Sequence, residues 1–217
     1  MDTQTGQVVR EFPRSDSPPT DFAIDPNFGW IAIAATDGQV RLLNFGDAAP
    51  RGQFGGHDGP IEDIAAHPDA RRIVTASVDG SVRLWNPPEP AVVMAGHPAP
   101  IRGLLSASNG TWSLTISDDL TARVWNPAGS TTLALGQHTQ PLRAVAIRDD
   151  DGAIATGDAE GLVRIWNSAS GAVEGIVKAH PAPLTAVVFT ADHTRLVTAA
   201  ADGTVRAWTL PLPQQAA

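Results

Sequence analysis

Four histidines recur with a hydroxyl residue, an acidic residue and a tryptophan, and this combination of residue types could do chemistry. His, Ser and Asp form the triad of many hydrolases, in which imidazole takes the proton of a hydroxyl nucleophile and a carboxylate orients the ring. Each of these histidines stands 28 residues before a tryptophan: His57, His97, His138 and His180 precede Trp85, Trp125, Trp166 and Trp208. A catalytic set occurs once in a chain, so the recurrence favours a structural role in a repeated unit.

The repeated unit is about 41 residues long and recurs five times, with Leu43 at the first tryptophan position and Ser15 at the first histidine position. An acidic residue lies six positions before each tryptophan position: Asp37, Asp79, Asp119, Glu160 and Asp202. Each unit contains four short runs rich in Val, Ile, Leu, Thr and Ala, without helical periodicity and with Asp-Gly or similar turns between them. The sequence therefore predicts an all-β protein with no helix.

The pattern GH…D…WN, repeated at this period, resembles the WD40 repeat, and the resemblance runs from about Thr3 to Trp208. It implies a β-propeller, with four-stranded antiparallel blades around a central channel. In that family a His, a Ser or Thr, an Asp and the Trp form a buried hydrogen-bonded network in each blade. The resemblance implies these network residues: His57, Ser77, Asp79, Trp85; His97, Ser117, Asp119, Trp125; His138, Asp158, Glu160, Trp166; His180, Asp202, Trp208.

The networks are expected to differ in quality. The second and third units carry complete sets, whereas Asp158 and Glu160 put two carboxylates near His138 in the fourth. The fifth has Ala200 where a hydroxyl relay is expected, and the first keeps only its aspartate. We expect the second and third blades to be the most rigid and the first the least rigid. In the turns, His67, His193 and the run 149–151 are interpreted as solvated surface residues.

The strand count predicts how the ring closes. Met1 falls on a tryptophan position, so residues 7–12 are interpreted as a fourth strand, and the last unit stops after its third strand. Pairing the two would close a five-bladed ring in one domain, 1–210, before a C-terminal tail, 211–217. The blades are expected at approximately 13–56, 57–96, 97–137, 138–179 and 180–210. A closed ring predicts a monomer; the alternative, a piece of a longer array, predicts open ends or self-association.

Composition excludes several classes of function. There are 15 Lys and Arg against 23 Asp and Glu, and the net charge of −8 disfavours nucleic-acid binding. The chain has no Cys, which excludes disulfides and thiolate zinc sites, and we expect neither a metal nor a cofactor. No apolar run approaches the ~20 residues of a membrane span, and the first residues show no secretory signal. The cytoplasm is the default expectation.

One set of equivalent positions differs from repeat to repeat, and such positions can recognise a partner. The position five after the histidine position, near the start of the innermost strand, is expected at one rim of the channel. It holds Thr20, Glu62, Arg102, Arg143 and Thr185. This mixed-charge ring is either an ordinary polar rim or a docking surface. We predict a non-catalytic scaffold that binds a peptide or protein. The alternatives are a fragment of a larger WD-repeat array, or a propeller enzyme with its site at the channel mouth.

Overall fold

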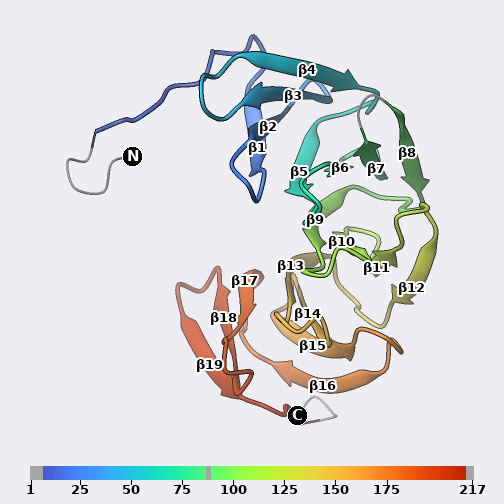
Figure 1. Cartoon of the computed structure of the whole chain (residues 1–217). Coiled ribbons are helices and arrows are strands. Elements are labelled where there is room, and N and C mark those ends of the chain that lie inside the picture. Colours follow the sequence, from blue (N-terminus) through green and yellow to red (C-terminus); the bar gives the residue numbers. More distant parts are fainter. Residues whose placement is uncertain (1–6, 87–88, 214–217) are drawn as a thin grey trace.

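The computed structural model describes residues 7–86 and 89–213, and these residues form an open arc of five antiparallel sheets (Figure 1). The first sheet contains β1 (Pro19–Ile24), β2 (Trp30–Ala35), β3 (Gln39–Asn44) and β4 (Pro50–Gly55). The second contains β5 (Ile61–Ala66), β6 (Ile73–Ser77), β7 (Ser81–Asn86) and β8 (Glu89–Ala95). The third contains β9 (Ile101–Ser106), β10 (Ser113–Ser117), β11 (Ala122–Trp125) and β12 (Thr131–Leu135).

The fourth sheet contains β13 (Leu142–Ile147), β14 (Ala153–Asp158), β15 (Leu162–Asn167) and β16 (Val173–Lys178). The fifth has three strands, β17 (Leu184–Phe189), β18 (Arg195–Ala200) and β19 (Val205–Thr209). Within each sheet the strands lie in chain order, from the concave edge of the arc outward (Figure 1). Over the described ranges, the predicted all-β architecture of antiparallel sheets is confirmed. No helix with the length and apolar character needed to cross a membrane occurs in these ranges.

Local sequence explains the strands and their turns. β6, β10 and β14 are buried along their whole length, since sheets cover both of their faces, and they read as continuous runs of apolar and small residues. The turns between second and third strands need a positive φ, which glycine adopts without strain. Gly80 has φ of 81°, and a Cβ there would collide with the carbonyl oxygen of His97.

The sheets pack face to face, with small residues of one sheet against larger apolar residues of the next. Ala32 and Leu42 of the first sheet share a buried cluster with Ile73 and Trp85 of the second. Similar clusters join the second sheet to the third, the third to the fourth and the fourth to the fifth. Interiors packed in this way resist gradual deformation, so the curvature of the arc is fixed at these four interfaces.

The predicted ring closure is not present in the structure. Residues 7–18 lie in no strand, the last sheet has three strands among the described residues, and residues 7–12 lie away from that sheet (Figure 1). The reason is that the segment packs on the first sheet instead. The ring of Phe12 lies 6.1 Å from that of Phe45, and the hydroxyls of Ser17 and Thr36 are 2.9 Å apart. These contacts hold residues 12–17 at the first sheet.

The C-terminal residues pack on the fourth sheet rather than continuing the fifth. After β19 the chain turns toward β16, where Leu212 is buried next to Gly175. The amide of Ile176 donates a hydrogen bond to the carbonyl oxygen of Pro213 at 2.6 Å. Part of the predicted tail, residues 211–213, therefore covers the outer strand of the fourth sheet, and the outer edge of β19 has no neighbouring strand among the described residues.

Candidate functional site

The repeated histidines lie in buried relays that run from indole to carboxylate. In the third sheet, the indole N–H of Trp125 donates to Thr115 Oγ1 at 2.8 Å, and that hydroxyl lies 2.8 Å from His97 Nε2. His97 Nδ1 lies 2.8 Å from Asp119 Oδ2. Because the carboxylate requires a proton on Nδ1, Nε2 accepts the threonine hydroxyl, and the neutral tautomer is fixed. Burial lowers the pKa of His97, which agrees with a neutral ring.

The same relay occurs in the second, fourth and fifth sheets. Its hydroxyl comes from a threonine ten positions before each tryptophan: Thr75, Thr115, Thr156 and Thr198. The sequence interpretation placed Ser77 and Ser117 in the relay, and the structure places them elsewhere. Ser77 Oγ donates to the carbonyl oxygen of Pro60 at 2.8 Å and accepts the amide of Asp79, so it holds the turn.

Two further expectations about these relays are wrong. In the fourth sheet, His138 Nδ1 contacts only one of the two acidic residues, Asp158, at 2.9 Å. Glu160 turns outward, and its carboxylate accepts a hydrogen bond from the side-chain amide of Gln140. The expected conflict between two carboxylates therefore does not arise. In the fifth sheet, Thr198 supplies the hydroxyl that Ala200 lacks, and it lies 2.8 Å from His180 Nε2.

The carboxylates of these relays also close the turns that carry them. Burial alone would raise the pKa of Asp79, but hydrogen bonds from the Ser81 hydroxyl and amide and from the Asp58 amide outweigh it and lower that pKa to about 2. The side chains of His57 and His97 are fully shielded from solvent. A substrate cannot reach either ring nitrogen, so the arrangement stabilises the sheet and does not activate a nucleophile. The described residues contain no group of three or more His, Cys, Asp or Glu placed to hold a metal.

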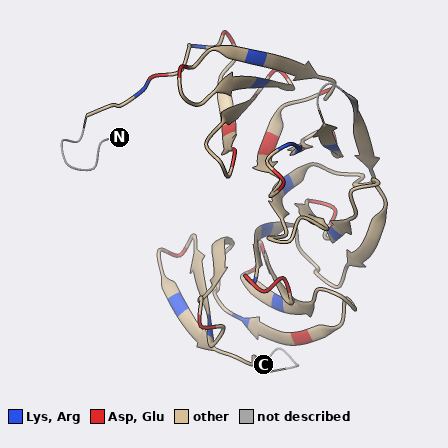
Figure 2. Cartoon of the chain, viewed as in Figure 1, with Lys and Arg blue, Asp and Glu red and all other residues tan. Residues whose placement is uncertain are grey.

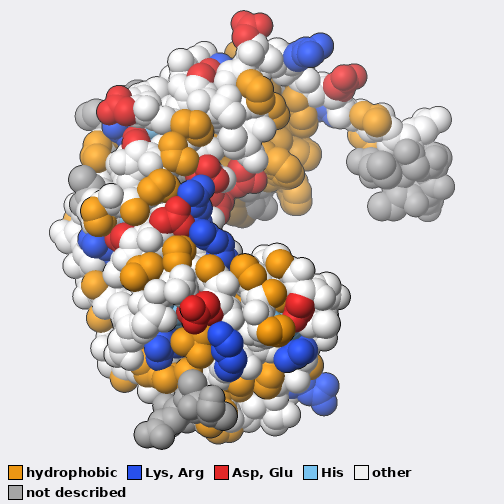
Figure 3. Space-filling view, turned by 180° about the vertical axis from the view of Figure 1, so that it is seen from behind, with side chains coloured by type: hydrophobic (Ala, Val, Ile, Leu, Met, Phe, Trp, Pro, Cys, Tyr) orange, Lys and Arg blue, Asp and Glu red, His pale blue; other side chains and the backbone are white. Residues whose placement is uncertain are grey.

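The predicted rim positions are each the second residue of an innermost strand, and each is exposed: Thr20, Glu62, Arg102, Arg143 and Thr185. The structure brings three of them together. Acidic and basic segments of β5, β9 and β13 follow one another along the concave edge of the arc (Figure 2), and charged side chains of both signs gather at this edge in the space-filling view (Figure 3). Thr20 and Thr185 lie on the end sheets, outside this group.

Asp118 organises the three central rim residues. Its Oδ2 accepts from Arg102 Nη2 at 2.6 Å, and its Oδ1 accepts from Arg143 Nη1 at 2.6 Å. Arg102 also lies 3.6 Å from Glu62. The two arginines lower the pKa of Asp118, Arg102 more strongly, so this carboxylate is charged near neutral pH. We call Glu62, Arg102, Asp118 and Arg143 the rim cluster; it joins three sheets.

Sequence reasoning missed Asp118, which lies in the turn between β10 and β11. The sequence marks Asp118 only by its negative charge. Its position is not acidic in other repeats, because the second repeat has Val78 there and the fourth has Ala159. Its reach to Arg143 depends on how the third and fourth sheets pack, and no pattern within one repeat encodes that packing.

A second group of polar residues crosses between sheets nearer their middle. The amide of Ile64 donates to Asp21 Oδ2 at 3.1 Å, and the amide of Leu104 donates to Asp63 Oδ2 at 2.8 Å. Each aspartate thus ties its innermost strand to the next one. The pKa of Asp63 is raised to about 7, chiefly by burial; the hydrogen bond from the Leu104 amide opposes the rise, and a hydrogen bond shared with Asp21 adds to it.

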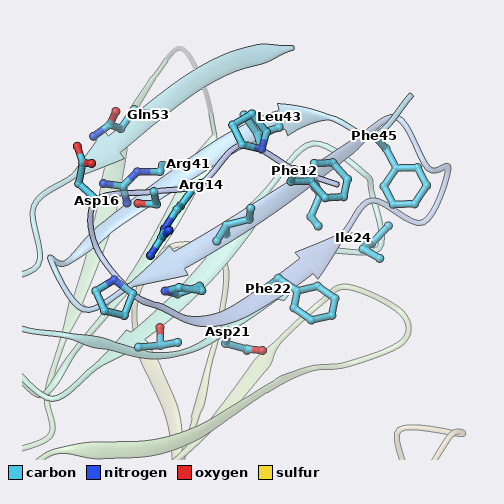
Figure 4. Close-up of a pocket in the computed structure, with 17 residues that line it drawn as sticks. Phe12, Arg14, Asp16, Asp21, Phe22, Ile24, Arg41, Leu43, Phe45 and Gln53 are labelled. Atoms are coloured by element: carbon cyan, nitrogen blue, oxygen red, sulfur yellow. The ribbon is translucent and has the colours of Figure 1, made fainter. Parts of the chain in front are cut away.

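A groove lies on the open face of the first sheet, under the N-terminal segment (Figure 4). Its volume is 1160 Å³. Phe12 and Arg14 form one wall, and Phe22 and Leu43 belong to the sheet opposite (Figure 4). In the other four sheets the equivalent face is covered by the preceding sheet. Sequence reasoning missed the groove because the predicted ring closure would have covered this face.

A comparison with protein families gives one match. The model described as "WD domain, G-beta repeat" (WD40) matches residues 49–86, 88–126, 129–167 and 171–209, most of the chain. Each match begins near the outer strand of one sheet and runs through the three inner strands of the next; the last covers β16 to β19. The predicted first repeat is not matched. A search of curated proteins found no similar sequence.

Proposed function

Because the chain belongs to the WD40 family, whose domains typically mediate interactions between proteins, we propose that it is a non-catalytic scaffold for a peptide or protein partner. The observation that carries the proposal is the rim cluster. Three sheets contribute its side chains, and their backbones are fixed by strand pairing and by the buried clusters between sheets. A partner would meet a preformed surface, which lowers the entropy lost on binding.

The charges of the rim cluster suit recognition better than folding. Exposed ion pairs of this kind contribute only about 0–1 kcal/mol to stability. The Arg102 and Arg143 side chains remain about one third exposed, so their remaining N–H donors can bind a carboxylate of the partner, as Arg does in bidentate pairs. Glu62 offers the opposite charge beside them. The partner is therefore a polypeptide with charges of both signs, for which complementary charge gives specificity.

The buried relays support a scaffold over an enzyme. Their histidines, the residues best suited to acid–base chemistry, are occupied at both ring nitrogens. The net charge of −8 supports a polypeptide partner over nucleic acid. Location in the cytoplasm remains a prediction.

The larger-array interpretation also has one observation in its favour. Both end sheets expose apolar side chains on the faces that in other sheets are covered, for example Phe22 at one end and Val188 at the other. The closed ring of five repeats likewise remains a prediction. It is supported by the outer edge of β19, which has no neighbouring strand among the described residues, and Phe12 would have to leave Phe45 for residues 7–12 to reach that edge.

A charge-reversal experiment tests the rim. The wild type is used to select peptides from a displayed random library, and the variant Arg102→Glu plus Arg143→Glu is then tested against the selected peptides. We expect the variant to lose binding, because both Asp118 and the partner's carboxylates would face like charge. The matched control is Arg71→Glu plus Arg195→Glu, which makes the same charge change at the opposite ends of the sheets. Equal binding by a folded rim variant would reject this site.

A further inference from the structure

The carboxylate of Asp118 is not needed by the turn that carries it. In all five sheets the residue at this position, seven before the tryptophan position, donates its backbone amide to a proline carbonyl oxygen at 2.9–3.1 Å. Among the described residues, the hydrogen bonds and ion pairs of the Asp118 side chain are all with Arg102 and Arg143. The turn therefore forms without this carboxylate, which serves the two arginines. The residues at this position in the other sheets are uncharged: Thr36, Val78, Ala159 and Ala201.

Asp118 binds the two arginines as a ligand would, but incompletely. Arg102 directs Nε and Nη2 to one oxygen, Oδ2, at 2.9 and 2.6 Å, and Arg143 directs only Nη1 to the other oxygen, Oδ1. Neither guanidinium forms the two parallel bonds to two oxygens that make arginine–carboxylate pairs strong. One short side chain that meets two guanidiniums at once cannot give both of them that geometry.

The contact between Asp118 and the arginines is open to solvent. The side chains of Arg102, Arg143 and Asp118 are 35%, 36% and 21% exposed. The backbone on either side of Asp118 is fixed, because Ser117 is buried and Asp119 belongs to the relay of the third sheet. The carboxylate can therefore leave the arginines by side-chain rotation alone, while the turn keeps its shape.

We propose that Asp118 is an internal ligand in the seat of the partner's acidic side chain, and that a partner binds the rim cluster by displacing it. This inference rests on the proposed function and specifies the chemistry of the partner. The partner presents an aspartate or glutamate to Arg102 and Arg143 and a basic residue to Glu62, which lies 3.6 Å from Arg102. Exchange of one carboxylate for another keeps a negative charge between the two guanidiniums, so their mutual repulsion is not exposed at any stage of binding.

The internal ligand has a predictable effect on affinity. It lowers the apparent affinity by the fraction of molecules in which the arginines are open. One ion pair at the upper end of the range for exposed pairs favours the closed state about fivefold, and two such pairs about thirtyfold. Removal of the carboxylate should therefore strengthen the binding of an acidic peptide. A purely organising role for Asp118 gives the opposite result, because arginines without their organiser would bind the peptide more weakly.

Calorimetric titration with the acidic peptides selected by the wild type measures the sign of this effect. Asp118→Asn keeps the size of the side chain and removes its charge, and we expect it to bind these peptides about five- to thirtyfold more tightly. The matched control, Asp150→Asn, takes a carboxylate from Arg148 in the turn between β13 and β14, at the opposite end of the sheets, and should not change the affinity. Equal or weaker binding by folded Asp118→Asn, or an equal gain in the control, would overturn the proposal.

A small probe separates the failure of this proposal from the failure of the proposed function. Glutamate with an acetylated amine and an amidated main-chain carboxyl carries only the side-chain carboxylate, and NMR of the arginine Nε–H groups follows its titration. We expect Asp118→Asn to bind it at least about fivefold more tightly than the wild type does, with shifts at Arg102 and Arg143. If this preference is present and the wild type selects no peptide, the proposed function fails and the internal ligand stands. Equal titration of the two proteins, or none by Asp118→Asn, would overturn the internal ligand even where peptides bind.

Discussion

The relay hydroxyl of Thr115 gives the sharpest test of how the sheets are stabilised. Thr115→Val keeps the shape of the side chain and removes the hydroxyl that accepts from Trp125 and donates to His97. Both partners are buried, and Thr115 is fully buried. Each unsatisfied buried polar group costs about 1–3 kcal/mol, so the variant should lose about 2–6 kcal/mol of unfolding free energy.

Thr115→Ser is the matched variant, since it keeps the hydroxyl and removes one methyl group, which costs about 1 kcal/mol. Ser117→Ala removes a hydroxyl that donates to the carbonyl oxygen of Pro100, and its cost should be smaller than that of Thr115→Val. Urea unfolding followed by tryptophan fluorescence measures all three. The reasoning is refuted if Thr115→Val is as stable as Thr115→Ser, or if Ser117→Ala is the most damaging of the three.

Three other substitutions test separate contacts. Because burial raises the pKa of Asp63 from 3.8 to about 7, the native state binds more protons than the unfolded chain, and stability falls as pH rises from about 4 to about 7. The difference in melting temperature between Asp63→Asn and the wild type should therefore shift in favour of Asp63→Asn when the pH is raised from 4.5 to 8. A difference that does not change with pH contradicts this. His67→Ala removes a 2.6 Å bond to the carbonyl oxygen of Gly110 between the second and third sheets and should cost about 1–3 kcal/mol; an unchanged urea midpoint argues against it. Gly80→Ala forces a Cβ onto a φ of 81° and should cost at least about 1 kcal/mol, and a variant as stable as the wild type would show that the turn adapts.

The sequence predicts what repeats and misses what depends on neighbouring sheets. His57, Asp79 and Trp85 stand at offsets that recur, so their pattern identifies the unit and its strands. A threonine also recurs at a fixed offset from each tryptophan, and Thr75 is the one in the second sheet. The family resemblance asks only for a hydroxyl near the histidine, so it pointed to Ser77, although Thr75 bonds to His57 and Ser77 bonds to the Pro60 carbonyl. Only the geometry distinguishes the relay from the turn.

The turn residues show the second limit. His67 lies in a turn and was interpreted as a surface residue, but it is buried because the turn of the third sheet lies against it. Asp151 is buried for the same reason and accepts the amides of Ser108 and Asn109 from the neighbouring sheet. His193 is partly exposed and pairs with Asp149, in agreement with its surface interpretation.

Ring closure shows a third limit. Counting strands predicted that residues 7–12 would complete the last sheet, but counting cannot show where Phe12 packs. In the structure its ring lies against Phe45, and that local contact holds the segment at the first sheet.

Hydrogen exchange in the presence of a peptide selected by the wild type tests most directly whether the rim cluster docks a partner. The non-proline amides of 58–62, 98–102, 118–120 and 139–143 lie in the segments that carry the cluster or flank it, and we predict that the peptide slows their exchange. Protection confined to the opposite turns, such as 67–72 and 190–195, or to the groove residues 12–24, would contradict it.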